Sequence, residues 1–472
     1  MKKFVLVSTN TLLTIRYKGL GQQVRGGSRG VLSHLWALIL ACLAPLAFAH
    51  EHGANAMHPS PSATPGSSLV CAKSYPVHCA AAPSTVFDNS GKLWVAYALD
   101  GFVYVSTSAD LGVSYSSPVR VNRVSEPVAA KGENRPKIAL GLRNEIYISW
   151  TKTTEGAYTG DIRFARSTNG GVSFEPARTI NDDGLLTSHR FDAMTVGARG
   201  NIYLAWIDKR DNIAAGDAPY PGAALYYTVS TDSGLHFSPN IKVADNSCEC
   251  CRVAAAPFSA DAKDESDSIA LLWRHIFSGD IRDHALTRLH GATPAVPIKR
   301  VSFDNWQINA CPHHGPSLSV DRAFLHATWF SGEATNPGIF YGRFSAPNYQ
   351  PEQVVRISQR GSHAFVLSVD GVPENQLLAK QKHISQTATV HLVWKAFADN
   401  RTHIYHQVST DAGHTWSVST SVAATDGGSD HPFIAARQAP STGTQQTFLS
   451  WQTENEGLRF FPLGIAAAKV HN

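Results

Sequence analysis

Charge is scarce in this chain of 472 residues. Only 17% of the residues are charged, and 41 Lys and Arg nearly balance 37 Asp and Glu. The clustered Lys and Arg of a nucleic-acid-binding surface are missing, so we expect no nucleic-acid partner, and we predict no nucleotide cofactor either. Heptads and long charge runs are missing too, which excludes a coiled coil, and the 10% aromatic content excludes bulk disorder.

Long apolar runs are also lacking after the N-terminal region. No later stretch approaches 18 apolar residues, so we expect no integral membrane span. The short apolar run 35–48 follows two arginines and ends in Ala47-Phe48-Ala49, the small-x-small pattern of a signal-peptidase site. We therefore predict that residues 1–49 are a signal peptide and that the protein is periplasmic or secreted. Lipid anchoring at Cys42 is a less favoured alternative, because apolar sequence continues beyond it.

Residues 50–69 are rich in His, Pro and Ser and contain too little apolar surface to order themselves, so they are predicted to be a flexible leader. Cleavage after Ala49 would leave His50 as the N-terminus. Its α-amine and imidazole, with His52 two residues away, form a nitrogen-rich set that suits Cu(II). We predict that this leader binds copper and that the folded body spans 70–472.

Two repeats indicate how the body folds. The pattern Ser-x-Asp/Asn-x-Gly-x-x-aromatic, which is typical of a hairpin turn, occurs at 108–115, 167–174, 230–237 and 409–416. Alternating strands that end in an aromatic residue occur seven times, at Tyr97, Trp150, Trp206, Trp273, Trp329, Trp394 and Trp451. These aromatics are 53 to 67 residues apart. Four-stranded units that repeat at this spacing predict an all-β, seven-bladed β-propeller, with six blades as the alternative. The ring must close on itself, and 70–77 is the predicted closing strand.

The turn pattern resembles the Asp boxes, or BNR repeats, of the sialidase-like superfamily. The resemblance implies a propeller with these turns on the blade rims, away from the channel. It also implies a glycosidase site of three arginines, a Tyr and Glu pair and an Asp acid, although true sialidases have six blades. In this sequence Arg135 precedes Pro136 much as in the family's arginine motif, and Asp192 is a candidate acid, but no Tyr and Glu pair is evident.

Arg, His and Cys recur where each inner strand should begin, and successive blades would bring these positions to one mouth of the channel. Arg135, Arg190 and Arg252 could form a fork of guanidinium groups around an anion. Thiolate and imidazole ligands suit copper or zinc, and the predicted metal ligands at the mouth are His313, His314, His363, His431, Cys248, Cys250, Cys251 and Cys311.

Disulfides are the alternative for the cysteines, because an exported protein meets oxidising conditions. Cys71 and Cys79 would close a local loop, and Cys311 would pair with one of the three cysteines at 248–251. We therefore expect an exported propeller that binds copper, zinc or a small anionic ligand at its channel mouth. The alternative is an exo-α-sialidase or related glycoside hydrolase acting on glycans, so binding protein and enzyme both stay open.

Overall fold

The computed structural model describes residues 75–258, 267–293, 297–345, 349–370, 388–439 and 444–464. The chain divides into two compact units, 1–62 and 63–472, and every described residue belongs to the second. The predicted signal peptide, the leader with His50 and His52, and Cys71 lie outside the described residues. Within the described part, no helix has the length and apolar character needed to cross a membrane.

Seven antiparallel sheets make up the described structure, and we number them as blades in chain order. Blades 1 and 2 contain β1 (Ala81–Phe87), β2 (Leu93–Leu99), β3 (Phe102–Ser108), β4 (Val119–Arg120), β5 (Lys137–Leu140), β6 (Ile146–Thr153), β7 (Gly160–Ser167) and β8 (Arg178–Thr179). Blades 3 and 4 contain β9 (His189–Val196), β10 (Ile202–Asp208), β11 (Ala223–Ser230), β12 (Ile241–Ser247), β13 (Ala254–Pro257), β14 (Ser268–Arg274), β15 (His284–His290) and β16 (Lys299–Arg300).

The remaining three sheets follow the same order. Blades 5, 6 and 7 contain β17 (Ser317–Val320), β18 (Phe324–Ser331), β19 (Gly338–Ser345), β20 (Gln350–Ser358), β21 (Ser362–Val369), β22 (Thr389–Ala398), β23 (Arg401–Ser409), β24 (Thr420–Thr425), β25 (Phe433–Gln438), β26 (Gln445–Thr453) and β27 (Gly457–Leu463). Two short helices complete the described elements, η1 (Pro76–Cys79) and α1 (Arg210–Ala215). Blade 7 has three strands among the described residues, where four were predicted.

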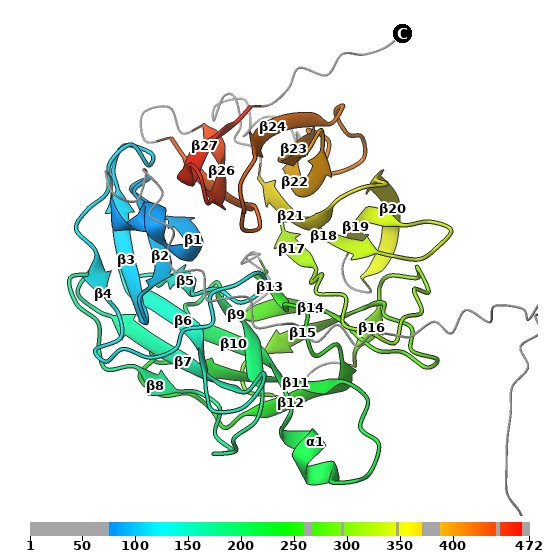
Figure 1. Cartoon of the computed structure of the whole chain (residues 1–472), viewed down its shortest axis with the longest axis horizontal. Helices are drawn as coiled ribbons and strands as arrows, with labels where there is room; N and C mark the ends of the chain where they lie inside the picture. The colour runs from blue at the N-terminus through cyan, green and yellow to red at the C-terminus, as the bar shows by residue number, and fades with distance from the viewer. Residues whose placement is uncertain are drawn as a thin grey trace, which may run out of the picture. The chain divides into compact units, whose positions relative to one another are not determined.

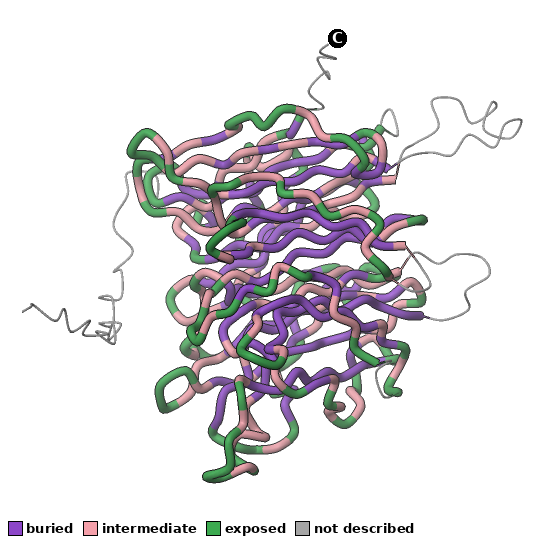
Figure 2. The backbone as a smooth tube through the Cα atoms, turned by 90° about the vertical axis from the view of Figure 1, so that its right-hand side faces the viewer, coloured by how far each residue is buried: buried purple, intermediate pink, exposed green. Residues whose placement is uncertain are grey.

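The inner strands close a ring. Each blade's first strand contacts the first strand of the next blade, and β25 contacts β1, so blade 7 joins blade 1 (Figure 1). The predicted seven-bladed propeller is therefore confirmed. Figure 2 shows that buried residues follow the strands, while exposed residues gather in the connecting loops.

The seven predicted aromatics stand on the second strand of each blade, and all are buried. The two faces of a sheet pack against different neighbours, as β10 shows with its residues in two clusters, so an aromatic on the second strand fills the space between two blades. Trp150 on β6, for example, packs in one cluster with Trp94 and Ala96 of blade 1. The repeated aromatic is thus a packing residue, and it sets the blade count.

The Asp-box turns join the third and fourth strands of blades 1, 2, 3 and 6. In the first, Ser108 Oγ donates to Asp110 Oδ1 at 2.7 Å, and Asp110 Oδ1 accepts the Ser114 N–H at 2.9 Å. Gly112 has φ +86, a conformation that favours glycine, and its N–H donates to Ser108 Oγ at 2.8 Å. These bonds stay inside the turn, so the motif stabilises the fold at a place remote from the inner strands.

The predicted closing strand is wrong where the structure describes it. Pro76–Cys79 form the 3-10 helix η1, which begins with a proline. The fixed φ of proline is compatible with the first turn of a helix, and because proline has no N–H it cannot donate a hydrogen bond to a neighbouring strand. Residues 70–74 lie outside the described residues. The helix packs against β27, and Gln452 Nε2 donates to the His78 carbonyl at 2.9 Å, which ties the last blade to the segment before the first.

Candidate functional site

A cavity of about 230 Å³ lies where the inner strands begin, and residues from all seven blades line it. Apolar and small residues form most of its wall. The charged and titratable side chains on the wall are Glu133, Arg135, Lys137, Arg252 and His431. The predicted convergence of distant segments at one mouth is therefore seen for part of the predicted set.

Glu133 lies at the centre of this group and is buried. Its two carboxylate oxygens accept bonds from Arg252 Nη1 at 3.1 and 3.0 Å, and Oε1 lies 3.1 Å from His363 Nδ1. His431 Nδ1 is 3.8 Å from the same oxygen. Burial alone would raise the pKa of Glu133, but the Arg252 charge and the His363 hydrogen bond outweigh it and hold this pKa well below its usual range.

The guanidinium groups of Arg252 and Arg135 bridge different blades. Arg252 Nε and Nη2 each donate at 3.0 Å, to the carbonyls of Pro316 and Ala364. Arg135 Nη1 donates to the Pro83 carbonyl at 3.1 Å, and its Nη2 pairs with Asp430 at 3.0 Å. Both groups are thus engaged by the protein itself, although both line the cavity.

Arg190 does not join the other two predicted arginines on the cavity wall. Its guanidinium lies over the rings of Tyr158 and Phe191, with its carbon 5.8 and 4.9 Å from their centroids. The structure therefore brings together two of the three members of the predicted arginine fork.

Three of the four predicted histidines meet beside Glu133. The rings of His363 and His431 stack with centroids 3.4 Å apart and an interplanar angle of 14°, and His314 lies 4.7 Å from His363. Burial lowers the pKa of all three, that of His314 to about 3. His313 is exposed, on a residue with φ +53 that turns the chain before β17.

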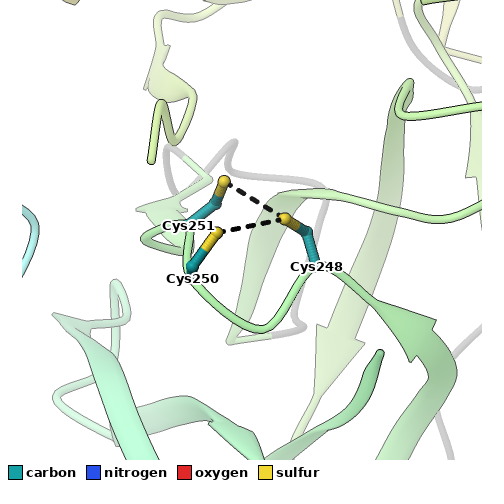
Figure 3. Close-up of side chains that lie close together, drawn as sticks. All are labelled: Cys248, Cys250 and Cys251. Carbon is teal, nitrogen blue, oxygen red and sulfur yellow. Dashed lines mark hydrogen bonds between the residues drawn. The ribbon is translucent and has the colours of Figure 1, made fainter. Parts of the chain in front are cut away.

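The thiols of Cys248, Cys250 and Cys251 form a second cluster, where the chain leaves β12 for blade 4. All three are buried, and Cys248 Sγ lies 3.7 Å from Cys250 Sγ and 3.4 Å from Cys251 Sγ. Figure 3 shows the three side chains pointing toward one another. Hydrogen bonds with Cys250 and Cys251 lower the pKa of Cys248 well below its usual value. The pKa values of Cys250 and Cys251 are raised.

Cys311 is exposed and approaches the cluster from blade 5. A hydrogen bond with Cys250 lowers the pKa of Cys311 to about 7, and the charges of Arg282 and Lys209 act in the same direction. All four of these cysteines are free thiols. The alternative pairing of Cys311 with one of the other three is therefore not formed, and the 3.4 and 3.7 Å spacings within the cluster far exceed a sulfur–sulfur bond of about 2.05 Å. The Cys71–Cys79 bridge stays a prediction, because Cys71 lies outside the described residues.

Asp192, the predicted acid, is buried away from the cavity wall. Its Oδ2 accepts the Ser149 hydroxyl at 2.6 Å, and its Oδ1 lies 4.0 Å from Lys137 Nζ. The described residues that line the cavity include Glu133 but no tyrosine. The Tyr and Glu pair that the resemblance implies is therefore not on this wall.

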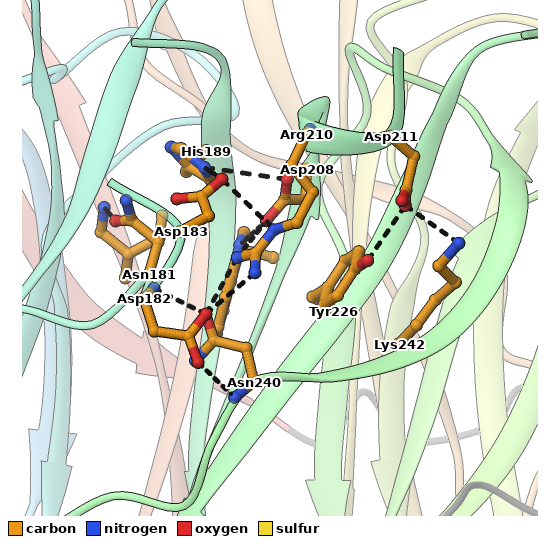
Figure 4. A network of polar contacts seen from close by, with 12 residues as sticks. Asn181, Asp182, Asp183, His189, Asp208, Arg210, Asp211, Tyr226, Asn240 and Lys242 are labelled. Atoms are coloured by element: carbon orange, nitrogen blue, oxygen red, sulfur yellow. Dashed lines mark hydrogen bonds and ion pairs between the residues drawn. The ribbon is translucent and has the colours of Figure 1, made fainter. Parts of the chain in front are cut away.

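A third polar cluster joins β9 and β10. His189 Nε2 lies 3.0 Å from Asp183 Oδ2 and 3.7 Å from Asp208 Oδ1. Arg210 at the start of α1 contacts both of these aspartates, and Asp182 and Asn240 as well (Figure 4). Because Arg210 already neutralises the carboxylates, we interpret this cluster as an ion-pair network that stabilises the packing of β9, β10 and α1.

Glu133 is the site residue that sequence reasoning missed. The signal was its position two residues before Arg135, in a segment expected at the mouth. A carboxylate among predicted cations and imidazoles is the group that would hold them together, since each of them can pair with it.

Comparison with known proteins gives likenesses only among solved structures. No family model matches the chain, and no curated protein matches its sequence. A Hadza microbial sialidase, Hz136, is 14% identical with a TM-score of 0.43, covering 80% of this chain and 77% of that one. A PL25 ulvan lyase is 13% identical with a TM-score of 0.47, over 80% and 91%. The Penicillium chrysogenum α-L-arabinanase is 11% identical with a TM-score of 0.44, over 82% and 94%.

These neighbours are sialidase-like and related β-propeller enzymes. Their likeness concerns the fold and carries no activity over to this chain. The chain's own sheets and turns show a seven-bladed β-propeller that carries Asp-box turns.

Proposed function

We propose that this is an exported protein that binds a thiophilic metal ion, zinc or copper(I), through Cys248, Cys250 and Cys251. The observation that carries the proposal is the convergence of three buried thiols, whose sulfur atoms all lie within 4.8 Å of one another. Thiolate ligands about 2.3 Å from a tetrahedral zinc ion stand about 3.8 Å apart, close to the 3.7 and 3.4 Å between these sulfurs. Little rearrangement is needed for binding.

The surroundings of the thiols support the same proposal. A metal ion with three or four thiolates carries net negative charge, which is costly to bury without cations nearby. Four cationic side chains interact electrostatically with these thiols or with Cys311. They are Arg190, Lys209, Arg274 and Arg282. Cys311 would complete a four-thiolate set that suits zinc, whereas three thiolates suit copper(I).

Metal analysis of the purified mature protein tests the proposal. We expect the zinc or copper content to fall by about one equivalent per chain in Cys248→Ser and in Cys251→Ser, because each variant loses a ligand of the thiol site. His236→Gln, which changes an exposed histidine of blade 3, is the control for surface binding and should keep the metal. Retention in Cys311→Ser would assign three thiolates. Equal metal content in all variants, or a metal-free protein with disulfides at these positions, would overturn the proposal.

Sialoside hydrolysis is the alternative function, and fewer observations support it. The guanidinium groups of Arg135 and Arg252 are occupied by protein partners, and Asp192 is off the cavity wall. Turnover of a fluorogenic sialoside that is lost in Glu133→Gln would favour the glycosidase. Copper binding by the leader stays a proposal as well, and a variant lacking His50 and His52 tests it in the same metal analysis.

A further inference from the structure

We infer that Glu133, His363 and His431 form a second metal site, for a divalent ion of borderline softness such as zinc, at the mouth of the central cavity. This site is chemically distinct from the thiols and does not depend on them. The three residues come from the segments before β5, at the start of β21 and before β25, so blades 2, 6 and 7 each contribute one ligand. One carboxylate oxygen and two imidazole nitrogens lie within 4.8 Å of one another.

The spacing of these atoms matches a metal coordination shell. Ligands about 2.0 to 2.1 Å from a tetrahedral zinc ion stand about 3.3 Å apart. Glu133 Oε1 is 3.1 Å from His363 Nδ1 and 3.8 Å from His431 Nδ1, so the observed distances bracket that value. Both imidazoles place Nδ1 near the same oxygen, and because the two rings are stacked at 14°, one of them must turn for both nitrogens to point at a shared cation.

Hydrogen bonding alone leaves this cluster incompletely satisfied. His431 Nδ1 is buried without a hydrogen-bond partner among the described residues, and so is Nδ1 of His314, whose ring is tilted by 53° against that of His363. An unpaired buried nitrogen costs free energy. A metal ion bound to Nδ1 of His363 and His431 would satisfy the first of these atoms, and a rotation of His314 would offer a fourth ligand.

Arg252 is the group that metal binding must move. Only its Nη1 contacts Glu133, whereas Nε and Nη2 are held by the Pro316 and Ala364 carbonyls. A small shift of the guanidinium would therefore free the carboxylate while keeping two of its bonds. Because Glu133 and His431 also line the 230 Å³ cavity, the bound ion would keep a position open for water or a small anion.

Cobalt(II) titration of a thiol-free protein tests the site. In a background in which Cys248, Cys250, Cys251 and Cys311 are all replaced by Ser, we expect one Co²⁺ to bind without the intense charge-transfer band that thiolate ligands produce. His431→Gln should weaken this binding at least about tenfold, since losing even an outer-shell partner of a ligand costs that much. His236→Gln, on exposed blade 3 surface, should leave the affinity unchanged.

Glu133→Gln is the second variant, because it retains an acceptor for Arg252 while weakening a metal ligand. Thermal unfolding of the metal-free variants checks that each is folded. Failure of the thiol-free protein to bind Co²⁺, or equal affinity in His431→Gln, would overturn the inference. The thiol site is judged separately: if Glu133→Gln with intact cysteines still gives the thiolate charge-transfer band, the first proposal stands whatever the outcome at the cavity.

Discussion

The Arg252 and Glu133 pair offers a quantitative test of what holds the channel mouth together. Arg252→Met would leave a carboxylate that is 3% exposed without its main cation, and would leave the carbonyls of Pro316 and Ala364 without donors. Removing one partner of a buried ion pair costs about 3–5 kcal/mol. We expect Arg252→Met to lower the free energy of unfolding by that amount.

Glu133→Gln should cost less, about 1–3 kcal/mol, because the amide oxygen still accepts from Arg252. In the double variant neither charge remains buried alone. We therefore expect the two single losses to exceed the loss in the double variant by about 2 kcal/mol, a coupling within the range for residues in contact. Urea unfolding of the metal-free proteins at pH 7 measures all three values.

The exposed pair of Arg401 and Asp426 is the matched control. Its Nε–Oδ1 distance is 2.7 Å, but the side chains are 44% and 70% exposed. Solvent screening should reduce the coupling in Arg401→Met with Asp426→Asn to below about 1 kcal/mol. If the buried pair shows no more coupling than this surface pair, the reasoning about the channel mouth is wrong.

Two further predictions concern residues away from the channel mouth. Burial lowers the pKa of His391 to about 3 and that of His406 to about 4, so only the unfolded chain, with histidines near about 6.5, takes up these protons. Stability should fall as pH drops from about 6.5 toward 4, by up to about 2.7 kcal/mol per pH unit from this pair, and unfolding at pH 6, 5 and 4 should show a shallower fall in His391→Gln. In the blade 2 turn, Gly171→Ala would place Cβ 2.6 Å from Trp94, whereas Gly170→Ala meets nothing within 4 Å, and both have positive φ. Thermal unfolding should show a loss of about 1 kcal/mol for Gly170→Ala and a clearly larger one for Gly171→Ala; equal losses would contradict the packing argument.

The sequence predicts the blades well because the information is local and repeated. Trp206 lies in a short apolar run, and a similar run recurs in every blade. Every residue of this strand is buried, because its two faces pack in two different clusters. The Ser, Asp and Gly of each Asp box interact within their own turn, which is why the pattern can be read without knowing the neighbours.

The site is less predictable because it depends on side-chain direction. Arg190 lies at the start of β9 much as Arg252 lies just before β13, yet the Arg190 side chain lies on two aromatic rings instead of the cavity wall. The contact between Glu133 and His363 joins residues 230 positions apart. His313 and His314 are adjacent, but His313 has a positive φ and is exposed, while the His314 ring lies 4.7 Å from that of His363. No spacing rule contains that information.

The contacts of Arg252 have a consequence for how the ring comes apart. In a toroidal array of blades, each unit normally interacts only with its two nearest neighbours, so one interface could open while the rest persists. Arg252 enters from blade 4 yet contacts blades 2, 5 and 6 through Glu133, Pro316 and Ala364. The Arg252 guanidinium therefore links blades that are not adjacent in the ring. Opening one of these interfaces must strain the others, and the unfolding of the ring becomes cooperative around its centre.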